Sequence, residues 1–428
     1  MFRSVRLLHR TLLLLFVLVL STALPAAATK GKAEAVPDQL VVGLSPLFTG
    51  TIGDINATYG TTTLAELNQL IFLLLVPEDS SAGAIKDAMA LDLRLEFAEP
   101  NFISESPEHS GQDVWAWGGQ DSEPYAGQSA LAQLNILPAH EFTRGAGSLV
   151  AVIDTGVQLD HPALASHLVP GLDLVDGDLE PADTGNNQDD DGDGLVDEAV
   201  GHGTHVAGIV QLVAPEAQIM PIRALDSDGR SDIFRVAMAI QYASESGTDV
   251  INLSLGLGAK SVLLRDVIRQ ATRAGAVVVA AAGNLASDLE QYPAASQCAL
   301  AVTAVGPANQ RSDFANYGDW IDFVAPGEAI YSTFTGSSYA WWSGSSMAAP
   351  FVAGQAALLH SVNPDLNARE VTLLIASTAA AVDASNPAVP GQLGAGLPNV
   401  AASVAMLLSG ALPTGNNGYM SGGCVATS

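Results

Sequence analysis

The chain has 428 residues, and its 17 lysines and arginines against 45 aspartates and glutamates give a formal net charge of -28 at pH 7. Hydrophobic residues make up 48% and charged residues only 14%, which excludes a disordered acidic protein, because such proteins are poor in apolar residues. The acidity argues against nucleic acid and against an anionic membrane surface as partners, since both need clustered lysine and arginine. Two cysteines, Cys298 and Cys424, are too few for a disulfide framework, and whether they pair stays open.

The first 28 residues have the pattern of a secretory signal peptide. Arg3, Arg6 and Arg10 precede an apolar run at 12–20, and small residues follow at 26–28. The run is much shorter than the roughly 20 apolar residues that a membrane span needs. The sequence therefore predicts removal of residues 1–28 and a secreted protein, extracellular or periplasmic, with no membrane segment in its mature form.

Residues 29–110 are expected to form a small α+β unit and the start of a linker. Apolar stretches at 40–44 and 91–97 predict strands, and the segments 63–70 and 82–89 predict helices. The polar stretch 104–120 has no hydrophobic periodicity and is interpreted as an exposed linker.

Residues 111–428 are expected to form one α/β domain. Buried-type strands alternate with helical segments from residue 148 onward: strands at 148–153, 218–223, 249–254, 276–282 and 299–305, and helices at 203–212, 232–246 and 260–274. Near-continuous apolar strands separated by helices predict a doubly wound, mostly parallel sheet with helices on both faces. In such sheets functional residues gather at the carboxyl ends of the strands.

Three motifs in this domain carry side chains suited to catalysis. Asp154 directly follows a buried strand, His202 begins an apolar helix, and Ser346 stands at a glycine-flanked turn that enters another helix. Each has an ordinary structural explanation by itself, as a turn or capping residue. His202 and His205 also suggest a metal pair, but the i, i+4 histidine spacing and the glutamate of helical zinc motifs are absent. The order aspartate, histidine, serine along the chain is one of the orders known for serine hydrolase triads, the one found in subtilisin.

With these motifs the chain resembles the subtilisin-like serine proteases, or subtilase family. The segment 250–256 resembles the family's substrate-binding strand, and 281–284 resembles the segment with the oxyanion asparagine. Three further segments match in order, at 292–294, 316–318 and 324–327. The resemblance covers roughly residues 130–402, and 98–102 also resembles the end of the propeptide in secreted members.

The resemblance implies a secreted serine endopeptidase that hydrolyses peptide bonds through an acyl-enzyme. Ser346 would be the nucleophile, His202 its base, Asp154 the group that orients the histidine, and Asn284 an oxyanion donor. The walls of the specificity pocket would be small and uncharged, which favours a broad, apolar-leaning specificity: Ser254, Leu255, Gly256, Ala281, Ala282 and Gly283. Its partners would be protein or peptide substrates and its own propeptide, an inhibitor and chaperone cleaved between about residues 104 and 120. We expect a monomer.

An acidic insertion separates Asp154 from His202. Residues 173–198 contain 11 acidic and no basic side chains. Within them Asp189, Asp191 and Asp193 alternate and a glycine follows, a pattern that wraps oxygen ligands around Ca²⁺. The twelfth position is a valine, so Asp197 or Glu198 would supply the closing carboxylate. The sequence predicts a structural calcium site; the alternative is a solvated acidic loop.

Three other functions remain open from sequence alone. An inactive, protease-shaped binding protein would usually have lost a triad residue, and a calcium-dependent adhesion protein leaves the ordered triad unexplained. A sedolisin-like acid peptidase shares the serine segment but carries a carboxylate in place of His202.

Overall fold

The structure is a computed structural model that describes residues 33–108 and 116–413. The chain divides into two units, Met1–Lys32 and Ala33–Ser428, and the described residues all belong to the second. The predicted signal peptide therefore lies outside the described residues.

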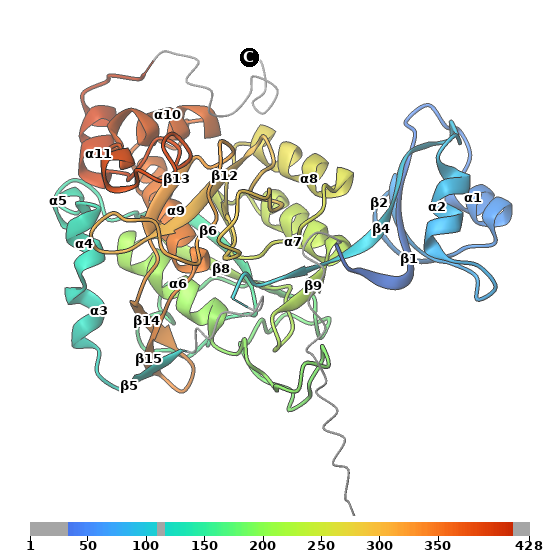
Figure 1. Cartoon of the computed structure of the whole chain (residues 1–428), viewed down its shortest axis with the longest axis horizontal. Helices are drawn as coiled ribbons and strands as arrows, with labels where there is room; N and C mark the ends of the chain where they lie inside the picture. Colours follow the sequence, from blue (N-terminus) through green and yellow to red (C-terminus); the bar gives the residue numbers. More distant parts are fainter. Residues whose placement is uncertain (1–32, 109–115, 414–428) are drawn as a thin grey trace, which may run out of the picture. The chain divides into compact units, whose positions relative to one another are not determined.

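The N-terminal part of the second unit is a small α+β fold (Figure 1). Its elements are β1 (Ala35–Leu44), α1 (Ile52–Tyr59), β2 (Thr62–Asn68), β3 (Ile71–Leu75), α2 (Ala82–Met89) and β4 (Leu95–Glu105). The strands form an antiparallel sheet in the order β2-β3-β1-β4. Leu40, Val42 and Leu74 of the sheet share a core with Ile55 and Met89 of the two helices.

The predicted strand at 40–44 and helix at 82–89 are confirmed, but the helix predicted at 63–70 is wrong. That segment is β2, in which exposed and half-buried residues alternate. Its run of β-branched threonines has restricted χ1 angles that suit a strand better than a helix. The strand predicted from residue 91 begins only at Leu95, because Leu91 and Leu93 are almost fully exposed in the preceding turn.

The expected exposed linker is also wrong over its first residues. β4 continues to Glu105 and pairs antiparallel with β9 (Arg230–Asp232). Ser104 and Ser106 are buried. Further on, β5 (Trp117–Gly119) pairs with β15 (Ser338–Trp342). Backbone pairing needs no apolar side chains, so hydrophobic periodicity carried no signal for these segments.

A seven-stranded sheet forms the centre of the C-terminal part, in the order β13-β12-β11-β10-β6-β8-β7, and all its neighbouring strands are parallel. Its strands are β6 (Leu149–Asp154), β7 (Leu172–Asp173), β8 (Gln218–Arg223), β10 (Val250–Leu253), β11 (Val277–Ala281), β12 (Ala299–Val305) and β13 (Phe323–Pro326). The five predicted strands of this sheet are confirmed, with bounds that differ by at most one residue.

Helices cover both faces of this sheet. Side chains that alternate along β6 separate into two cores: Val150 and Val152 pack with α6 (His202–Val213) and α9 (Ser345–Val362), while Ala151 and Ile153 pack with α7 (Ile233–Glu245) and α8 (Val262–Arg273). This two-sided burial explains why most residues of the central strands are apolar. The doubly wound α/β fold expected from the sequence is confirmed.

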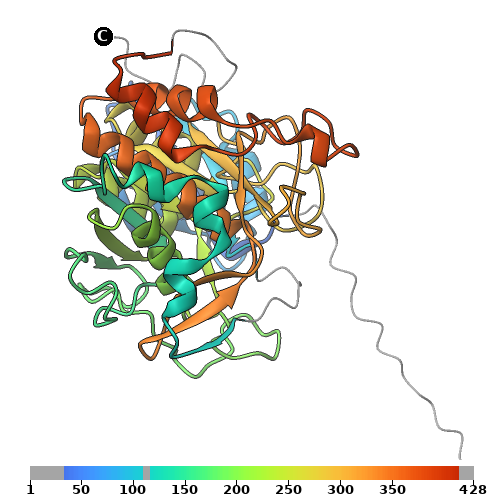
Figure 2. The ribbon, with the colours of Figure 1, turned by 90° about the vertical axis from the view of Figure 1, so that its left-hand side faces the viewer.

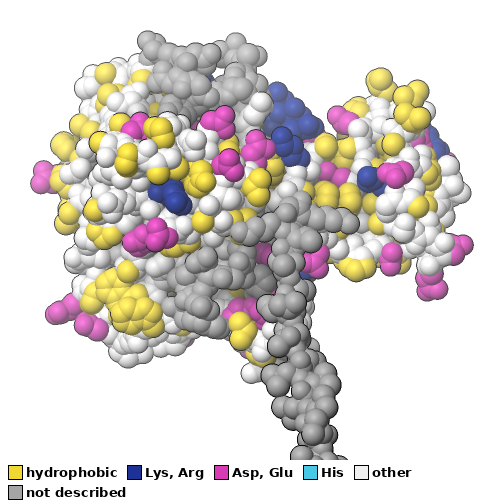
Figure 3. Space-filling view, in the orientation of Figure 1, with side chains coloured by type: hydrophobic (Ala, Val, Ile, Leu, Met, Phe, Trp, Pro, Cys, Tyr) yellow, Lys and Arg dark blue, Asp and Glu magenta, His cyan; other side chains and the backbone are white. Residues whose placement is uncertain are grey.

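The remaining elements lie around this framework. They are α3 (Glu123–Gly127), α4 (Ser129–Gln133), α5 (Ile136–Ala139), α10 (Ala368–Thr378), the 3₁₀ helix η1 (Asp383–Ser385), α11 (Val400–Leu408) and the strand β14 (Ile330–Phe334). Figure 2 turns α3 to α5, in teal, and α10 and α11, in red, toward the viewer. β14, β15 and β5 form a separate antiparallel sheet, and Figure 3 shows apolar side chains gathered over this region.

Two further observations concern predictions from the sequence. Cys298 is disulfide-bonded, and the chain's other cysteine, Cys424, lies outside the described residues. Within 33–108 and 116–413, no helix combines the length and the apolar character that crossing a membrane requires.

Candidate active site

The three residues of the predicted triad come together at the carboxyl edge of the sheet. Asp154 is the last residue of β6, His202 is the first of α6, and Ser346 is the second of α9. All three are completely buried. The Nδ1–H of His202 donates to Asp154 Oδ1 at 2.6 Å.

Two glycines allow α6 to begin at this position. Gly201 has φ = 96°, and a Cβ on it would lie 2.2 Å from the Phe334 ring. A Cβ on Gly203 would lie 2.1 Å from the Gly156 carbonyl oxygen. Any larger residue at either position would displace the start of the helix, and with it the imidazole of His202.

Asn284 is oriented toward the same point by α9. Its Oδ1 accepts the Ser345 N–H at 2.9 Å, and the Ser345 hydroxyl in turn accepts the Gly283 N–H at 3.0 Å. With its oxygen occupied in this way, the amide presents its Nδ2 donors to the space beside Ser346.

The predicted pocket walls lie next to these groups. Ser254 donates its hydroxyl to the Ser346 carbonyl oxygen at 3.1 Å and accepts from Asn252 Nδ2 at 3.0 Å. Leu255 and Ala282 are buried in the core on one side of the sheet and Ala281 in the core on the other side, and none of the three carries a charge. Gly256 exchanges two backbone hydrogen bonds with Glu105, at 3.0 and 2.8 Å.

A carboxylate that no sequence motif singled out occupies the centre of the site. Glu108 Oε2 accepts from Ser346 Oγ at 2.7 Å and from His202 Nε2 at 3.1 Å, and its Oε1 accepts from Asn284 Nδ2 at 2.9 Å. The side chain is only 6% exposed. The preceding residues guide it there, because Ser106 N–H donates to the Gly229 carbonyl at 2.9 Å just after the Glu105–Gly256 pairing.

The charges of these groups depend on one another. Burial alone would lower the pKa of His202, but the carboxylates of Asp154 and Glu108 raise that pKa to about 10. Burial alone would raise the pKa of Glu108, but its hydrogen bonds from His202, Ser346 and Asn284 lower that pKa. The contact is therefore between an imidazolium and a carboxylate.

An aromatic ring packs beside the site. The Trp342 indole meets the His202 ring edge to face, with centroids 5.3 Å apart. His205 is separate from this chemistry: its Nε2 lies 3.1 Å from the Ile330 oxygen and 3.0 Å from the Ala340 oxygen, and burial lowers its pKa to about 3. A neutral imidazole bonded to backbone carbonyls serves to join α6 to β14 and β15, so the geometry gives no support to a metal pair with His202.

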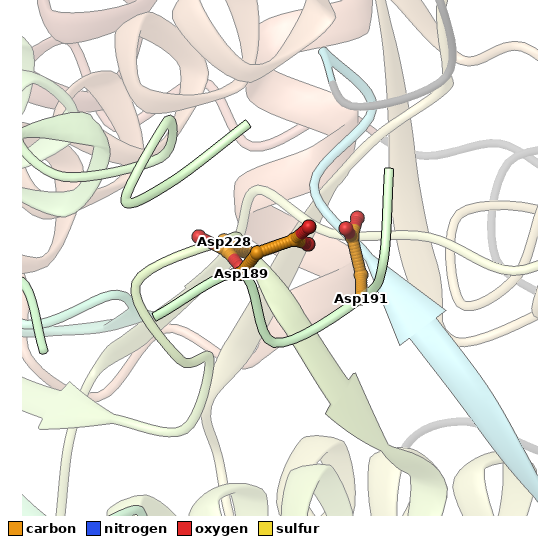
Figure 4. Close-up of side chains that lie close together, drawn as sticks. All are labelled: Asp189, Asp191 and Asp228. Carbon is orange, nitrogen blue, oxygen red and sulfur yellow. The ribbon is translucent and has the colours of Figure 1, made fainter. Parts of the chain in front are cut away.

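The acidic insertion brings carboxylates together in two overlapping groups. Asp189, Asp191 and Asp228 form one group, and Asp191, Asp193 and Glu198 form the other; within each, one oxygen per residue lies within 4.8 Å of the others. Figure 4 shows Asp228 approaching the loop of Asp189 and Asp191 from a separate segment.

Two residues differ from the calcium ligands that the sequence predicts: Asp197 is absent from the carboxylate groups and Asp228 is present. The Asp197 carboxylate lies outside both groups and accepts the backbone N–H of Asn186 at 2.8 Å. Asp228 was not predicted, because it follows the insertion by 30 residues (228 − 198) and only the folded chain brings it there. Burial and the nearby charge of Asp228 raise the pKa of Glu198 to about 7.

Comparisons with known families agree with the fold and with the motifs. Residues 145–396 match the subtilase family, and residues 21–101 match the fervidolysin N-terminal prodomain. A thermophilic serine proteinase from Bacillus sp. (strain AK1) is 37% identical over 313 residues, which cover 71% of this chain and 72% of that protein. Thermitase from Thermoactinomyces vulgaris is 39% identical over 56% of this chain and 85% of its own length.

A solved structure is similar over both parts of the described chain. Fervidolysin from Fervidobacterium pennivorans, a keratinolytic enzyme related to subtilisin, aligns with a TM-score of 0.73 at 23% identity. The alignment covers 90% of this chain and 63% of that one, and it supports the fold described above. Taken together, the family matches and the relatives establish that the chain belongs to the subtilase family and is a subtilisin-like serine protease with an N-terminal prodomain.

Proposed function

We propose that the chain is a secreted serine endopeptidase with Ser346 as nucleophile, His202 as general base and Asp154 as the residue that orients the base. One observation carries the proposal: Ser346 Oγ and His202 Nε2 both bond to the same oxygen of Glu108, while Asn284 bonds to the other. The hydroxyl, the base and the amide donor thus converge on a space of the size of one carboxylate.

The chemistry follows from what each group can do. A neutral serine hydroxyl is a poor nucleophile until a neighbouring base takes its proton, and His202 would do this once the Glu108 carboxylate has left. The 2.6 Å bond to Asp154 fixes the tautomer that leaves Nε2 free to accept that proton, and it stabilises the imidazolium that forms. The attacked carbonyl oxygen gains negative charge, which Asn284 Nδ2 and the Ser346 N–H would stabilise. His202 then returns the proton to the leaving amine, and water releases the acyl group from Ser346 by the same path.

Replacement of the nucleophile tests this assignment. We expect Ser346→Ala to lower kcat for a chromogenic peptide by more than about 10³-fold, because the acyl-enzyme cannot form. A serine-directed phosphonylating reagent should label the matured wild-type protein at Ser346 and leave the variant unlabelled. Ser409→Ala, at the exposed residue that follows α11, serves as the matched control. Turnover by Ser346→Ala equal to that of the control would refute the proposal.

The prodomain is the second part of the proposed function. We propose the division 1–28 signal peptide, 29–110 propeptide and 111–428 peptidase domain, with cleavage between about residues 104 and 120. The contacts of Glu108 with Ser346, His202 and Asn284 support an inhibited precursor, because a substrate carbonyl cannot enter while the carboxylate is there. Glu105 pairs through its backbone with Gly256. This pairing supports the proposal that the substrate residues before the scissile bond bind along the same backbone.

The specificity that we propose is broad and leans toward apolar residues. Ser254, Leu255, Ala281 and Ala282 are buried and carry no charge, so they offer no counter-ion to a basic substrate residue. Peptides that differ only in the residue before the scissile bond test this. We expect leucine or phenylalanine to be cleaved faster than arginine.

We also propose a structural Ca²⁺ ion, held by Asp189, Asp191 and Asp228 together with Asp193 and Glu198. The donor set fits, because it consists only of carboxylate oxygens, which a hard cation prefers, and because these oxygens already lie within 4.8 Å of one another in each group. A bound Ca²⁺ would fix the loop that leads into α6, and it has no role in the steps above.

Secretion and the state of the mature protein complete the proposal. The arginine-led apolar segment at the N-terminus supports export. The net charge of -28 supports a monomer that does not bind nucleic acid, since such a charge opposes both self-association and contact with phosphate. Growth medium that lacks the protein while the cells retain it would contradict export.

A further inference from the structure

Asp183, which the triad and the acidic groups leave without a role, is buried at the edge of the proposed active site. It is only 5% exposed. Its Oδ1 accepts from the Gly201 N–H at 2.9 Å and from Thr155 Oγ1 at 3.2 Å. Its Oδ2 accepts from the Thr204 N–H at 3.0 Å and from Thr204 Oγ1 at 2.6 Å. Four donors therefore meet one carboxylate, which uses its full accepting capacity.

These four bonds join the two segments that carry the triad's acid and base. Gly201 and Thr204 belong to the first turn of α6, on either side of His202. Thr155 follows Asp154, donates its N–H to Asp154 Oδ1 at 2.8 Å and accepts the Gly203 N–H at 3.0 Å on its hydroxyl. Asp183 thus connects the backbone on both sides of the 2.6 Å bond between His202 and Asp154.

The backbone of Asp183 is itself fixed. Its N–H donates to the Val157 carbonyl at 3.3 Å, and the Val157 N–H donates to the Pro181 carbonyl at 2.9 Å. Gly156, at φ = 100°, lets these two segments approach, since a Cβ there would lie 2.8 Å from the Pro181 oxygen. The carboxylate therefore acts from a rigid position and not from a mobile loop.

We propose that Asp183 is a positioning residue that holds the His202 imidazole against Asp154. The inference rests on the proposed function, in which His202 is the general base. A carboxylate is required because all its partners donate; an asparagine of the same shape would turn an NH₂ group against two of them. Its negative charge also lies at the positive N-terminus of α6. Burial, with a contribution from the charge of Asp154, raises the pKa of Asp183 to about 6, in keeping with a carboxylate shielded from water.

The test compares substitutions that keep shape and change hydrogen bonding. We expect Asp183→Asn to lower kcat by about 10²-fold with KM changed by less than about twofold, because a displaced base slows chemistry without altering the pocket. The acid limb of the pH profile should move to lower pH, since a weaker Asp154 contact stabilises the imidazolium less. Asp160→Asn removes an exposed carboxylate nearby and should behave like wild type.

A second pair of variants protects the test against a failure of Asp183→Asn to fold or mature. Thr155→Val removes the hydroxyl that links Asp183 to Gly203, whereas Thr155→Ser keeps it. We expect the valine variant to lose kcat and shift the acid limb in the same direction, and the serine variant to restore both. Wild-type kcat and acid limb in Asp183→Asn or in Thr155→Val would overturn the inference. Activity retained by Ser346→Ala would instead overturn the proposed function, so the two failures are distinguishable.

Discussion

At the scale of single residues, the Glu108 carboxylate decides whether the site is accessible. It is held by three donors, one of them a charged imidazole that is also buried. Removing one partner of a buried ion pair costs about 3–5 kcal/mol when the remaining charge is left uncompensated, and here the loss is smaller because Asp154 still faces His202. Glu108→Gln should therefore release the segment more readily and let activity appear sooner.

The measurement is the lag before a purified full-length chain hydrolyses a chromogenic peptide. We expect a lag at least about tenfold shorter for Glu108→Gln, since roughly 1.4 kcal/mol corresponds to a factor of ten. Glu96→Gln is the matched control, because Glu96 is exposed on the same strand, β4. Equal lags in the two variants would show that the carboxylate does not hold the segment in the site.

The same contact predicts how activation depends on pH. His202 has a pKa raised from 6.5 to about 10, and Glu108 supplies part of that rise. The stabilisation that comes from protonated His202 is complete below pH 6.5 and is lost as the pH rises toward 10. Glu108 has a pKa lowered from 4.5. The stabilisation that comes from its ionised carboxylate is therefore complete above pH 4.5 and is lost as the pH falls through the lowered pKa. The contact is therefore strongest between pH 4.5 and 6.5.

Activation rates of wild type and Glu108→Gln, measured from pH 6.5 to 10, isolate this effect from the pH dependence of the protease reaction itself. We expect the ratio of the variant's rate to the wild-type rate to fall toward one as the pH approaches 10. A ratio that stays constant across this range would contradict the imidazolium–carboxylate contact.

The site was predictable where a residue stands at the end of an apolar element. Asp154, His202 and Ser346 lie at the boundaries of β6, α6 and α9, and local hydrophobicity and glycine mark those boundaries in the sequence. Glu108, Asp183 and Asp228 gain their surroundings from segments far away in the chain, so no local pattern distinguished them from other acidic residues. Their partners became visible only with the fold.

At the scale of elements, β4 of the prodomain caps two helices of the peptidase part. Glu99 accepts from the Val262 N–H at 2.9 Å, the Leu263 N–H at 3.0 Å and Ser261 Oγ at 2.8 Å, all at the start of α8. Asn101 accepts the Phe234 N–H at 3.2 Å in the first turn of α7. Both contacts satisfy helix N–H groups that have no partner within their own helix.

Capping of this kind predicts a contribution to stability. We expect Glu99→Gln, made in the Ser346→Ala background to prevent self-digestion, to lower the free energy of unfolding by about 1 kcal/mol, the usual worth of a helix cap. Urea unfolding of the full-length chain measures it, and Glu96→Gln is again the control. An unchanged urea midpoint for Glu99→Gln would mean that α8 does not depend on the prodomain, since Ser261 also caps it.

Prediction of the elements succeeded in the parallel sheet and failed for two elements inside the prodomain, β2 and α1. Buried strands such as Ala299–Val305 are apolar in nearly every position, so their limits are easy to place. In β2, exposed and half-buried residues alternate but none is fully buried, so the strand gives only a weak hydrophobic pattern in the sequence. α1 was not predicted, although Thr51 and Asp54 form a capping box at its start and Gly60 ends it.

At the scale of the whole molecule, the acidity is concentrated beside the proposed active site. Residues 173–198 hold 11 of the 45 acidic residues of a chain whose net charge is -28. Carboxylates held within 4.8 Å of one another repel, so the fold of this segment should depend on a bound cation. The insertion leads directly into α6, and its loss of order would reach His202.

Removal of calcium tests this dependence in the full-length Ser346→Ala protein. A ligand at 100 times its Kd stabilises the native state by about 2.7 kcal/mol, so a chelator should lower Tm by roughly 3 °C in a chain of this length and added Ca²⁺ should restore it. Mg²⁺ should restore less, because it requires a tighter octahedral geometry. Asp228→Asn should reduce the response, whereas Glu180→Gln, an exposed carboxylate of the same insertion outside both groups, should keep it. A Tm that is the same with chelator and with Ca²⁺ would mean that the insertion is a solvated acidic loop, whose charges are screened by water and salt and not by a bound ion.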